Sequence, residues 1–451
     1  MADSTDTTCR PTKRELPTTP TLVSAIDSTR QHLRARITPQ GRKTGTIPGV
    51  RKSVSNSIRS AREGEDNGTG ANVGRIQMMF PEPLHVGRPN LGSRREFDRL
   101  VDGIFERNWL TNAGPLVLEL ERRIADFLDV GHCVTMANGT IALEIAIRAL
   151  GLTGEVIVPS YTFIATAHAL HWQGLTPVFA DIDPLTHNLD PDSVRTFITP
   201  RTSGIIGVHL WGRPAPVCEL QALADEHDLE LLFDAAHAFG NSHNGRMIGS
   251  FGRAEVLSFH ATKFFNTFEG GAVVTNDGDL AERMRLMRNF GFVDFDEVVY
   301  PGTNGKMAEV CAAMGLVNLD SIDAFTERNR ANHAAYGKVF GRSEQLHLYQ
   351  YDSASEGNHQ YVVVELAPSV SEYRDKLVAD LHAENIRARR YFWPGCHNME
   401  PYKSLFPHAG VHLPNTALVA ERVIVLPTGS AVQPGDCTRI GEFILSRLAC
   451  Y

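Results

Sequence analysis

Between about residue 95 and residue 325, short apolar runs alternate with stretches in which apolar residues recur three and four positions apart. This alternation is typical of a mostly parallel sheet that is covered by helices on both faces. Helices are expected at 117–128 and 140–150, and strands at 155–159, 177–181, 204–210, 229–234, 255–259 and 271–276. We therefore predict an α/β fold whose ligand crevice lies at the strand ends, where the polar residues stand.

The pattern changes after about residue 325. A helix with charged faces is expected at 321–340, followed by a strand at 359–366 and a second helix at 375–385. These elements predict a smaller α+β domain at 326–451, next to a large domain at 81–325.

Residues 1–80 have no sustained apolar period and are interrupted by prolines. They carry 13 Lys and Arg against 7 Asp and Glu, although the whole chain has a net charge of −8. Nucleic-acid binding needs basic residues on a folded face with aromatic residues between them, and this segment has almost no aromatic residues. We expect a disordered, solvated leader and no nucleic-acid partner. The GTGANVG segment at 68–74 lacks a preceding strand and the spacing of a nucleotide-binding loop.

The bulk composition excludes several classes of protein. The seven cysteines are scattered singly, which predicts free thiols and neither a metal site nor a disulfide framework. No run of eighteen apolar residues occurs, and the first residues lack the order of a secretory signal. We expect no membrane association and a cytoplasmic location.

Lys263 is the first candidate for chemistry, because it follows an apolar strand and precedes a glycine-rich return, in SFHATKFFNTFEGG at 258–271. A lysine that is held unprotonated in a desolvated site can condense with an aldehyde cofactor. Taken alone, a lysine after a strand is more often a solvated charge. Its neighbours in the sequence must therefore decide between the two interpretations.

Asp234 ends the apolar strand LELLFD, and His237 follows three residues later. Pyridoxal phosphate withdraws electrons only while its ring nitrogen is protonated, and a carboxylate facing that nitrogen raises its pKa. Asp234 suits this role, and His237 could contact the ring or its phenolic oxygen. The alternatives are an Asp that caps a following helix and a His that is simply packed.

The segment CVTMANGTIALEIAIRAL joins a strand to a helix through Asn138, Gly139 and Thr140. Free backbone amides at a helix start bind phosphate well, although the same residues also serve as a plain helix cap. Ser258 could add a hydroxyl to that phosphate, and Phe163 could stack on the cofactor ring. A turn donor and a core aromatic are the respective alternatives.

Taken together, these segments resemble the DegT-type sugar-nucleotide aminotransferases, a branch of the fold-type I pyridoxal-phosphate enzymes. The resemblance spans about residues 85–445 and implies the aspartate-aminotransferase-like fold. It rests on eight blocks in the family's order: NWLTNAGP (108–115), ANGTIAL (137–143), VPSYTFIATAHA (158–169), PVFADIDP (177–184), FDAAHAFG (233–240), SFHATKFFNTFEGG (258–271), RNFGF (288–292) and NGKMAEVCAAMGLVNL (304–319).

The resemblance also implies roles for individual residues. Lys263 matches the lysine that holds the cofactor as a Schiff base, Asp234 the partner of the pyridine nitrogen, and His237 the residue beside the ring oxygen. The implied contacts to the cofactor's ring and phosphate are Phe163, Gly139, Thr140, Ile141 and Ser258. Relatives that dehydrate sugars carry His at the lysine position, so Lys263 indicates amination.

The family is built as a homodimer with shared sites, which implies that Asn304 reaches the neighbouring subunit's phosphate. NGK at 304–306 departs from the more usual NYR, and Phe268 replaces a common glycine. In RRYFWPGCHNMEPY at 389–402, the resemblance makes Arg390, His397 and Tyr402 candidate contacts of the sugar or diphosphate. A surface loop without a ligand is the alternative.

The blocks around Lys263 and NGKM are most similar to the branch that aminates dTDP-4-keto-6-deoxyglucose at C4. The implied donor is an amino acid, by family analogy L-glutamate. The alternatives are a cyclitol or a 3-keto sugar as the acceptor, and a non-enzymatic, cofactor-bound regulator for which the leader would be a binding arm.

Overall fold

The structure is a computed structural model that describes residues 78–351 and 356–451. The predictions for residues 1–77, including the disordered leader and the GTGANVG segment, lie outside the described residues. Among the residues described, no helix combines the length and the apolar character that crossing a bilayer requires.

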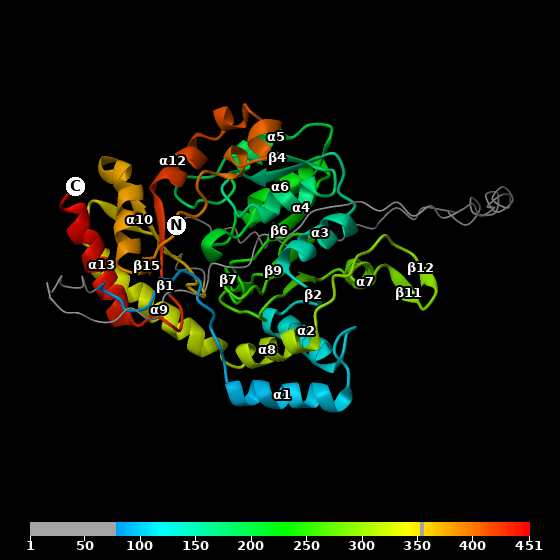
Figure 1. Cartoon of the computed structure of the whole chain (residues 1–451). Coiled ribbons are helices and arrows are strands. Elements are labelled where there is room, and N and C mark those ends of the chain that lie inside the picture. Colours follow the sequence, from blue (N-terminus) through cyan, green and yellow to red (C-terminus); the bar gives the residue numbers. More distant parts are fainter. Residues whose placement is uncertain (1–77, 352–355) are drawn as a thin grey trace, which may run out of the picture. The chain divides into compact units, whose positions relative to one another are not determined.

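A seven-stranded sheet forms the centre of the N-terminal part of the described chain (Figure 1). Its strands, in spatial order, are β2 (His132–Met136), β10 (Gly271–Thr275), β9 (Ala254–Ser258), β6 (Glu230–Asp234), β5 (Thr202–Val208), β3 (Glu155–Pro159) and β4 (Thr176–Ala180). All neighbouring pairs are parallel except those that β10 makes with β2 and β9. The predicted mostly parallel sheet and its six predicted strands are confirmed.

Alternate residues of each strand enter separate apolar cores on the two faces of the sheet. In β3, Ile157 belongs to one core and Val156 and Val158 to the other. This is the period of two that a strand imposes on its side chains. Because both faces are covered, the strands are almost wholly apolar, which is why they could be recognised as short continuous runs.

Helices supply the other half of each core. One face is covered by α2 (Pro115–Leu128), α5 (Pro191–Phe197), α6 (Val217–His227) and α8 (Glu309–Leu319), with α1 (Arg94–Arg107) beside α8. The other face is covered by α3 (Gly139–Ala149), α4 (Ala165–His171) and α7 (Gly278–Met287). The helices predicted at 117–128 and 140–150 are confirmed, and the covering of both faces agrees with the prediction.

Two short hairpins stand outside the large sheet. They are β7 (Ser242–His243) with β8 (Arg246–Met247), and β11 (Phe292–Asp294) with β12 (Glu297–Val298). The second hairpin follows α7 and projects away from the sheet (Figure 1).

The C-terminal part has its own sheet and core. The sheet consists of β13 (Leu346–Leu348), β14 (Val362–Leu366) and β16 (Val423–Leu426), and α9 (Ile322–Phe340), α10 (Arg374–Ala383) and α13 (Pro434–Leu448) pack against it. This part also contains α11 (Tyr402–Leu405), α12 (Pro414–Arg422) and β15 (Ile386–Arg387), which pairs with β1 (Leu84–His85), and three short 3-10 helices at Pro368–Tyr373, Cys396–Asn398 and Ala409–His412. The predicted elements at 321–340, 359–366 and 375–385 are present. The predicted domain boundaries stay predictions.

An aromatic cluster joins the C-terminal part to the large sheet. Tyr161 and Trp211, which follow strands of the sheet, pack with Tyr361 and Phe392 from the C-terminal part. This contact fixes the segment around Phe392 above the carboxyl ends of the strands.

Candidate active site

One cavity of about 590 Å³ lies at the carboxyl ends of β5, β6 and β9. Its position is the one that a doubly wound parallel sheet offers to a ligand. Eight residues predicted from the sequence line it: Gly139, Thr140, Ile141, Phe163, Asp234, His237, Ser258 and Lys263.

Lys263 lies in the turn between β9 and β10, where its backbone N–H donates to the carbonyl of His260 at 2.8 Å. Its side chain is half-buried and faces the cavity. Desolvation lowers the pKa of Lys263 to about 8, against the opposing influence of Asp234. A lysine with this pKa is partly neutral near pH 8, so its amine can act as a nucleophile or a base.

Asp234 is the last residue of β6 and is buried. Its Oδ2 accepts a hydrogen bond from Thr166 Oγ1 at 2.9 Å, and its Oδ1 accepts one from the N–H of Ala236 at 3.1 Å. Burial raises the pKa of Asp234, and these two hydrogen bonds partly offset the rise. No helix begins directly after β6, so the carboxylate does not cap one.

His237 is buried against aromatic rings. It stacks on Phe392 with an interplanar angle of 11°, and its Nδ1 accepts the backbone N–H of Trp211 at 3.3 Å. Burial lowers the pKa of His237 well below its usual value, so the ring is neutral. Because Nδ1 accepts a hydrogen bond, the proton of the neutral ring resides on Nε2.

The start of α3 and the end of β9 also line the cavity. Asn138 Oδ1 caps α3 by accepting the N–H of Ile141 at 2.8 Å, so the backbone N–H of Ile141, an implied cofactor contact, is already occupied. The N–H groups of Gly139 and Thr140 have no hydrogen-bond partner among the described residues. A Cβ at Gly139 would lie 3.0 Å from the Cβ of Ser258, so glycine allows the helix start to approach that serine closely.

Phe163 lies in the cavity wall with 55% of its surface exposed, which is unusual for a core aromatic. Its ring centroid is 6.4 Å from that of Phe392. The exposed ring is available for stacking on a planar ligand.

The predicted residues from the C-terminal part do not line the cavity. Arg390 pairs with Asp375, with 3.0 Å between Nη1 and Oδ1. Buried His397 contacts Ser160 Oγ at 2.7 Å through its Nδ1. Tyr402 is fully buried, and its hydroxyl contacts His168 Nδ1 at 2.8 Å.

Asn304 is exposed and lies opposite Asn289 in an isolated bridge, also outside the cavity lining. It is near a smaller hollow of about 130 Å³ whose lining includes Asn289 and Lys306. A role of Asn304 in a neighbouring subunit's site stays a prediction.

Sequence reasoning did not single out several residues that line the cavity. Tyr361, Tyr391 and Phe392 come from the C-terminal part, and Thr162 follows β3. Tyr391 and Phe392 stand inside the block at 389–402, so the aromatic pair next to the chosen Arg390 was a usable signal. Tyr361 belongs to no motif that could be recognised in the sequence. Its position in the cavity wall depends on the aromatic cluster.

Comparisons with known proteins identify the family of the chain. The DegT/DnrJ/EryC1/StrS aminotransferase family profile matches residues 93–445. The dTDP-4-amino-4,6-dideoxy-D-glucose transaminases of Shigella dysenteriae and Escherichia coli are 38% and 34% identical, over 81% and 82% of this chain and 98% and 100% of theirs. The crystal structure of DesI in the presence of its TDP-sugar product is similar with a TM-score of 0.79 and 50% identity, over 82% of this chain and 94% of DesI. The chain belongs to the DegT/DnrJ/EryC1/StrS aminotransferase family.

Proposed function

We propose that this protein is a pyridoxal-phosphate-dependent transaminase that moves an amino group from L-glutamate to C4 of dTDP-4-keto-6-deoxyglucose. The observation that carries the proposal is the placement of the desolvated amine of Lys263 in one cavity with the buried carboxylate of Asp234. The names of the similar transaminases and of DesI support a nucleotide-linked sugar as the acceptor.

The cavity residues fit pyridoxal phosphate at each of its functional groups. The N–H groups of Gly139 and Thr140, which have no partner in the described part of the chain, and the hydroxyl of Ser258 would hold the phosphate. The exposed ring of Phe163 would stack on the pyridine, and Asp234 would face its nitrogen. When bound, the cofactor supplies an aldehyde that condenses with amines and a ring that withdraws electrons.

Lys263 has two tasks in this proposal. Its neutral amine would hold the aldehyde between turnovers, and once released it would move a proton to and from the reacting carbon. A pKa of about 8 suits both tasks near neutral pH, because neither protonation state is then strongly disfavoured.

Asp234 and His237 would act on the cofactor ring from fixed positions. The hydrogen bonds from Thr166 and Ala236 hold the carboxylate in place and favour its ionised form. The N–H on Nε2 of neutral His237 is a donor suited to the ring oxygen. Asp234 would stay ionised and His237 would stay neutral throughout. Lys263 is then the side chain that gains and loses a proton during the reaction.

The experiment that tests the proposal presents the cofactor-loaded enzyme with L-glutamate and a panel of ketones. The expected result is rapid amination of dTDP-4-keto-6-deoxyglucose at C4, identified by mass spectrometry and NMR of the product. Faster turnover of a cyclitol or a 3-keto sugar would refute the assigned acceptor. If no ketone were transaminated, the result would favour the alternative of a non-enzymatic, cofactor-bound regulator.

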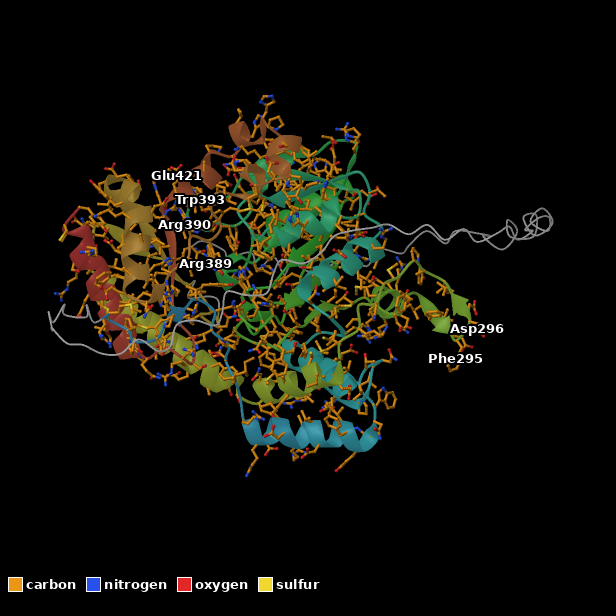
Figure 2. The ribbon with its side chains drawn as sticks, in the orientation of Figure 1. Phe295, Asp296, Arg389, Arg390, Trp393 and Glu421 are labelled. Carbon is orange, nitrogen blue, oxygen red and sulfur yellow. The ribbon has the colours of Figure 1, made fainter. Side chains whose placement is uncertain are left out.

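We also propose that the protein is a homodimer. The support is a set of exposed apolar side chains around the start of α2, on α1 and on the β11–β12 hairpin, where Phe295 is 94% exposed and projects from the tip (Figure 2). Exposed apolar side chains mark an association surface where they are contiguous. The set comprises Phe105, Trp109, Leu110, Leu118, Phe292, Val293, Phe295 and Val298.

Sedimentation velocity tests this proposal. The wild type is expected at twice the monomer mass. Phe295→Asp is expected to weaken the dimer, so that on dilution it dissociates at a higher protein concentration than the wild type. A monomeric wild type would refute the dimer.

A further inference from the structure

The adjacent side chains Arg389 and Arg390 have opposite surroundings. Arg390 pairs with Asp375 and lies over Trp393, with 4.7 Å between its Cζ and the ring centroid. The guanidinium of the exposed Arg389 has no ion pair or hydrogen bond within residues 78–351 and 356–451. Figure 2 shows Arg390 beside Trp393, with Arg389 separate from them. Arg389 is therefore free to bind an anion, and Arg390 is already occupied.

Tyr391 links Arg389 to the active-site cavity. The Cζ of Arg389 lies 4.9 Å from the ring centroid of Tyr391, and Tyr391 lines the same cavity as Lys263. Burial raises the pKa of the Tyr391 hydroxyl, and the charges of both Arg389 and Lys263 oppose the rise. The two cations thus lie within electrostatic reach of one phenol: Lys263 lines the cavity, and Arg389 lies outside the cavity lining, against the ring of Tyr391.

The backbone of Arg389 is held firmly. Its N–H donates to the carbonyl of Val425 at 3.0 Å, and its carbonyl accepts the N–H of Val425 at 2.8 Å. Val425 is a fully buried residue of β16. An arginine that projects from an anchored backbone presents its planar fork with less loss of freedom than one on a loose loop.

We propose that Arg389 binds the diphosphate that joins the sugar to its nucleotide. This inference rests on the proposed function and adds to it the residue that recognises the acceptor. A guanidinium forms paired, charge-assisted hydrogen bonds with phosphate oxygens. Because Arg389 has no ion pair within the described residues, a phosphate would not have to displace a carboxylate from it.

The position of Arg389 favours the diphosphate over the carboxylate next to the reacting carbon of the donor. That carboxylate is one bond from the carbon that must meet Lys263, so it stays inside the cavity. In a 4-keto sugar, the diphosphate is attached to C1, across the ring from the reacting C4. A sugar with C4 at Lys263 would therefore direct its diphosphate away from the lysine, toward a cation outside the cavity lining such as Arg389.

Calorimetric titration of the cofactor-loaded enzyme with dTDP, inorganic diphosphate and thymidine tests the inference. Arg389→Ala is expected to bind dTDP and diphosphate about 10- to 100-fold more weakly, the range for losing a charged hydrogen-bond partner. Thymidine binding should be unchanged. The affinity of Arg389→Lys for dTDP and diphosphate should lie between those of the wild type and Arg389→Ala, because lysine keeps the charge and loses the forked guanidinium. Arg330→Ala on α9 removes an equal charge elsewhere and should match the wild type.

Arg390→Ala tests the competing assignment, in which Arg390 and not Arg389 binds the diphosphate. An equal or larger loss of dTDP binding in Arg390→Ala would overturn the inference, as would an unchanged affinity in Arg389→Ala. A wild type that does not bind dTDP or diphosphate would also overturn it.

Steady-state kinetics separate this inference from the proposed function. Arg389→Ala should raise KM for the nucleotide keto sugar and leave the half-reaction with L-glutamate unchanged. A rise in KM for L-glutamate alone would assign Arg389 to the donor and overturn the inference. A wild type that aminates no nucleotide keto sugar would refute the proposed function, whatever the titrations show.

Discussion

The floor and the mouth of the cavity are built differently. The floor consists of residues at or just after strand ends, including Asp234, Ser258 and Lys263, and hydrogen bonds fix its carboxylate. A second part of the lining, which we call the mouth, consists of aromatic side chains from the C-terminal part, among them Tyr391 and Phe392, and loops position these residues. From this difference we propose that the floor performs the chemistry and that the mouth selects the substrate. Changes in the floor should lower kcat, and changes at the mouth should raise KM.

Lys263→Ala should have the largest effect, because it removes both the amine that condenses with the aldehyde and the base that moves the proton. We expect kcat to fall at least about 10⁴-fold, since one acid or base group alone contributes about 10²- to 10⁴-fold. The measurement is the rate of product formation together with the absorbance of the lysine-linked cofactor. A variant that keeps the absorbance and turns over normally would contradict the role of Lys263.

Asp234→Asn should come next. The amide keeps the shape of the carboxylate but cannot stabilise a protonated ring nitrogen, so the ring withdraws fewer electrons. We expect a loss of about 10²- to 10³-fold in kcat, comparable to removing one pre-organised electrostatic partner. Cofactor affinity, measured by equilibrium dialysis, should fall far less than kcat. Equal losses in both would indicate that Asp234 only holds the cofactor.

Thr166→Val should have a smaller, pH-dependent effect. The hydroxyl of Thr166 lowers the pKa of Asp234, so its removal raises that pKa. Asp234 is then protonated at a higher pH as the solution is acidified, and the acidic limb of the kcat/KM profile moves upward. We expect about a tenfold loss at the acidic end and little change at high pH.

Thr166→Ser is the matched control, because it restores the hydroxyl and should restore the profile. A uniform loss at every pH in Thr166→Val would show that the residue acts through packing alone.

Floor and mouth also differ in how well the sequence predicted them. Asp234, Ser258 and Lys263 could be found because parallel strands bring their carboxyl ends to one edge, so the ends of β6 and β9 point to one crevice. The side-chain contacts of the C-terminal part follow no comparable rule. Arg390 and Tyr402 were chosen from the correct block, yet their partners Asp375 and His168 lie elsewhere in the sequence.

Local hydrogen bonding set a second limit on the sequence prediction. The pattern at the start of α3 indicated an anion site but could not tell which amides the cap would leave open. Asn138 takes the amide of Ile141 and leaves those of Gly139 and Thr140. This choice depends on the backbone conformation of Asn138, which the identity of the residue does not determine.

Tyr391→Phe should have the smallest effect and tests the comparison most closely. The substitution keeps the ring beside Arg389 and removes only the hydroxyl, whose pKa the charges of Arg389 and Lys263 both lower. We expect KM for the keto sugar to rise about three- to tenfold, the value of one neutral hydrogen bond, with kcat changed less than twofold. A fall in kcat comparable to that of Asp234→Asn would place Tyr391 among the groups that take part in proton transfer. The division between a catalytic floor and a selective mouth would then fail at this residue.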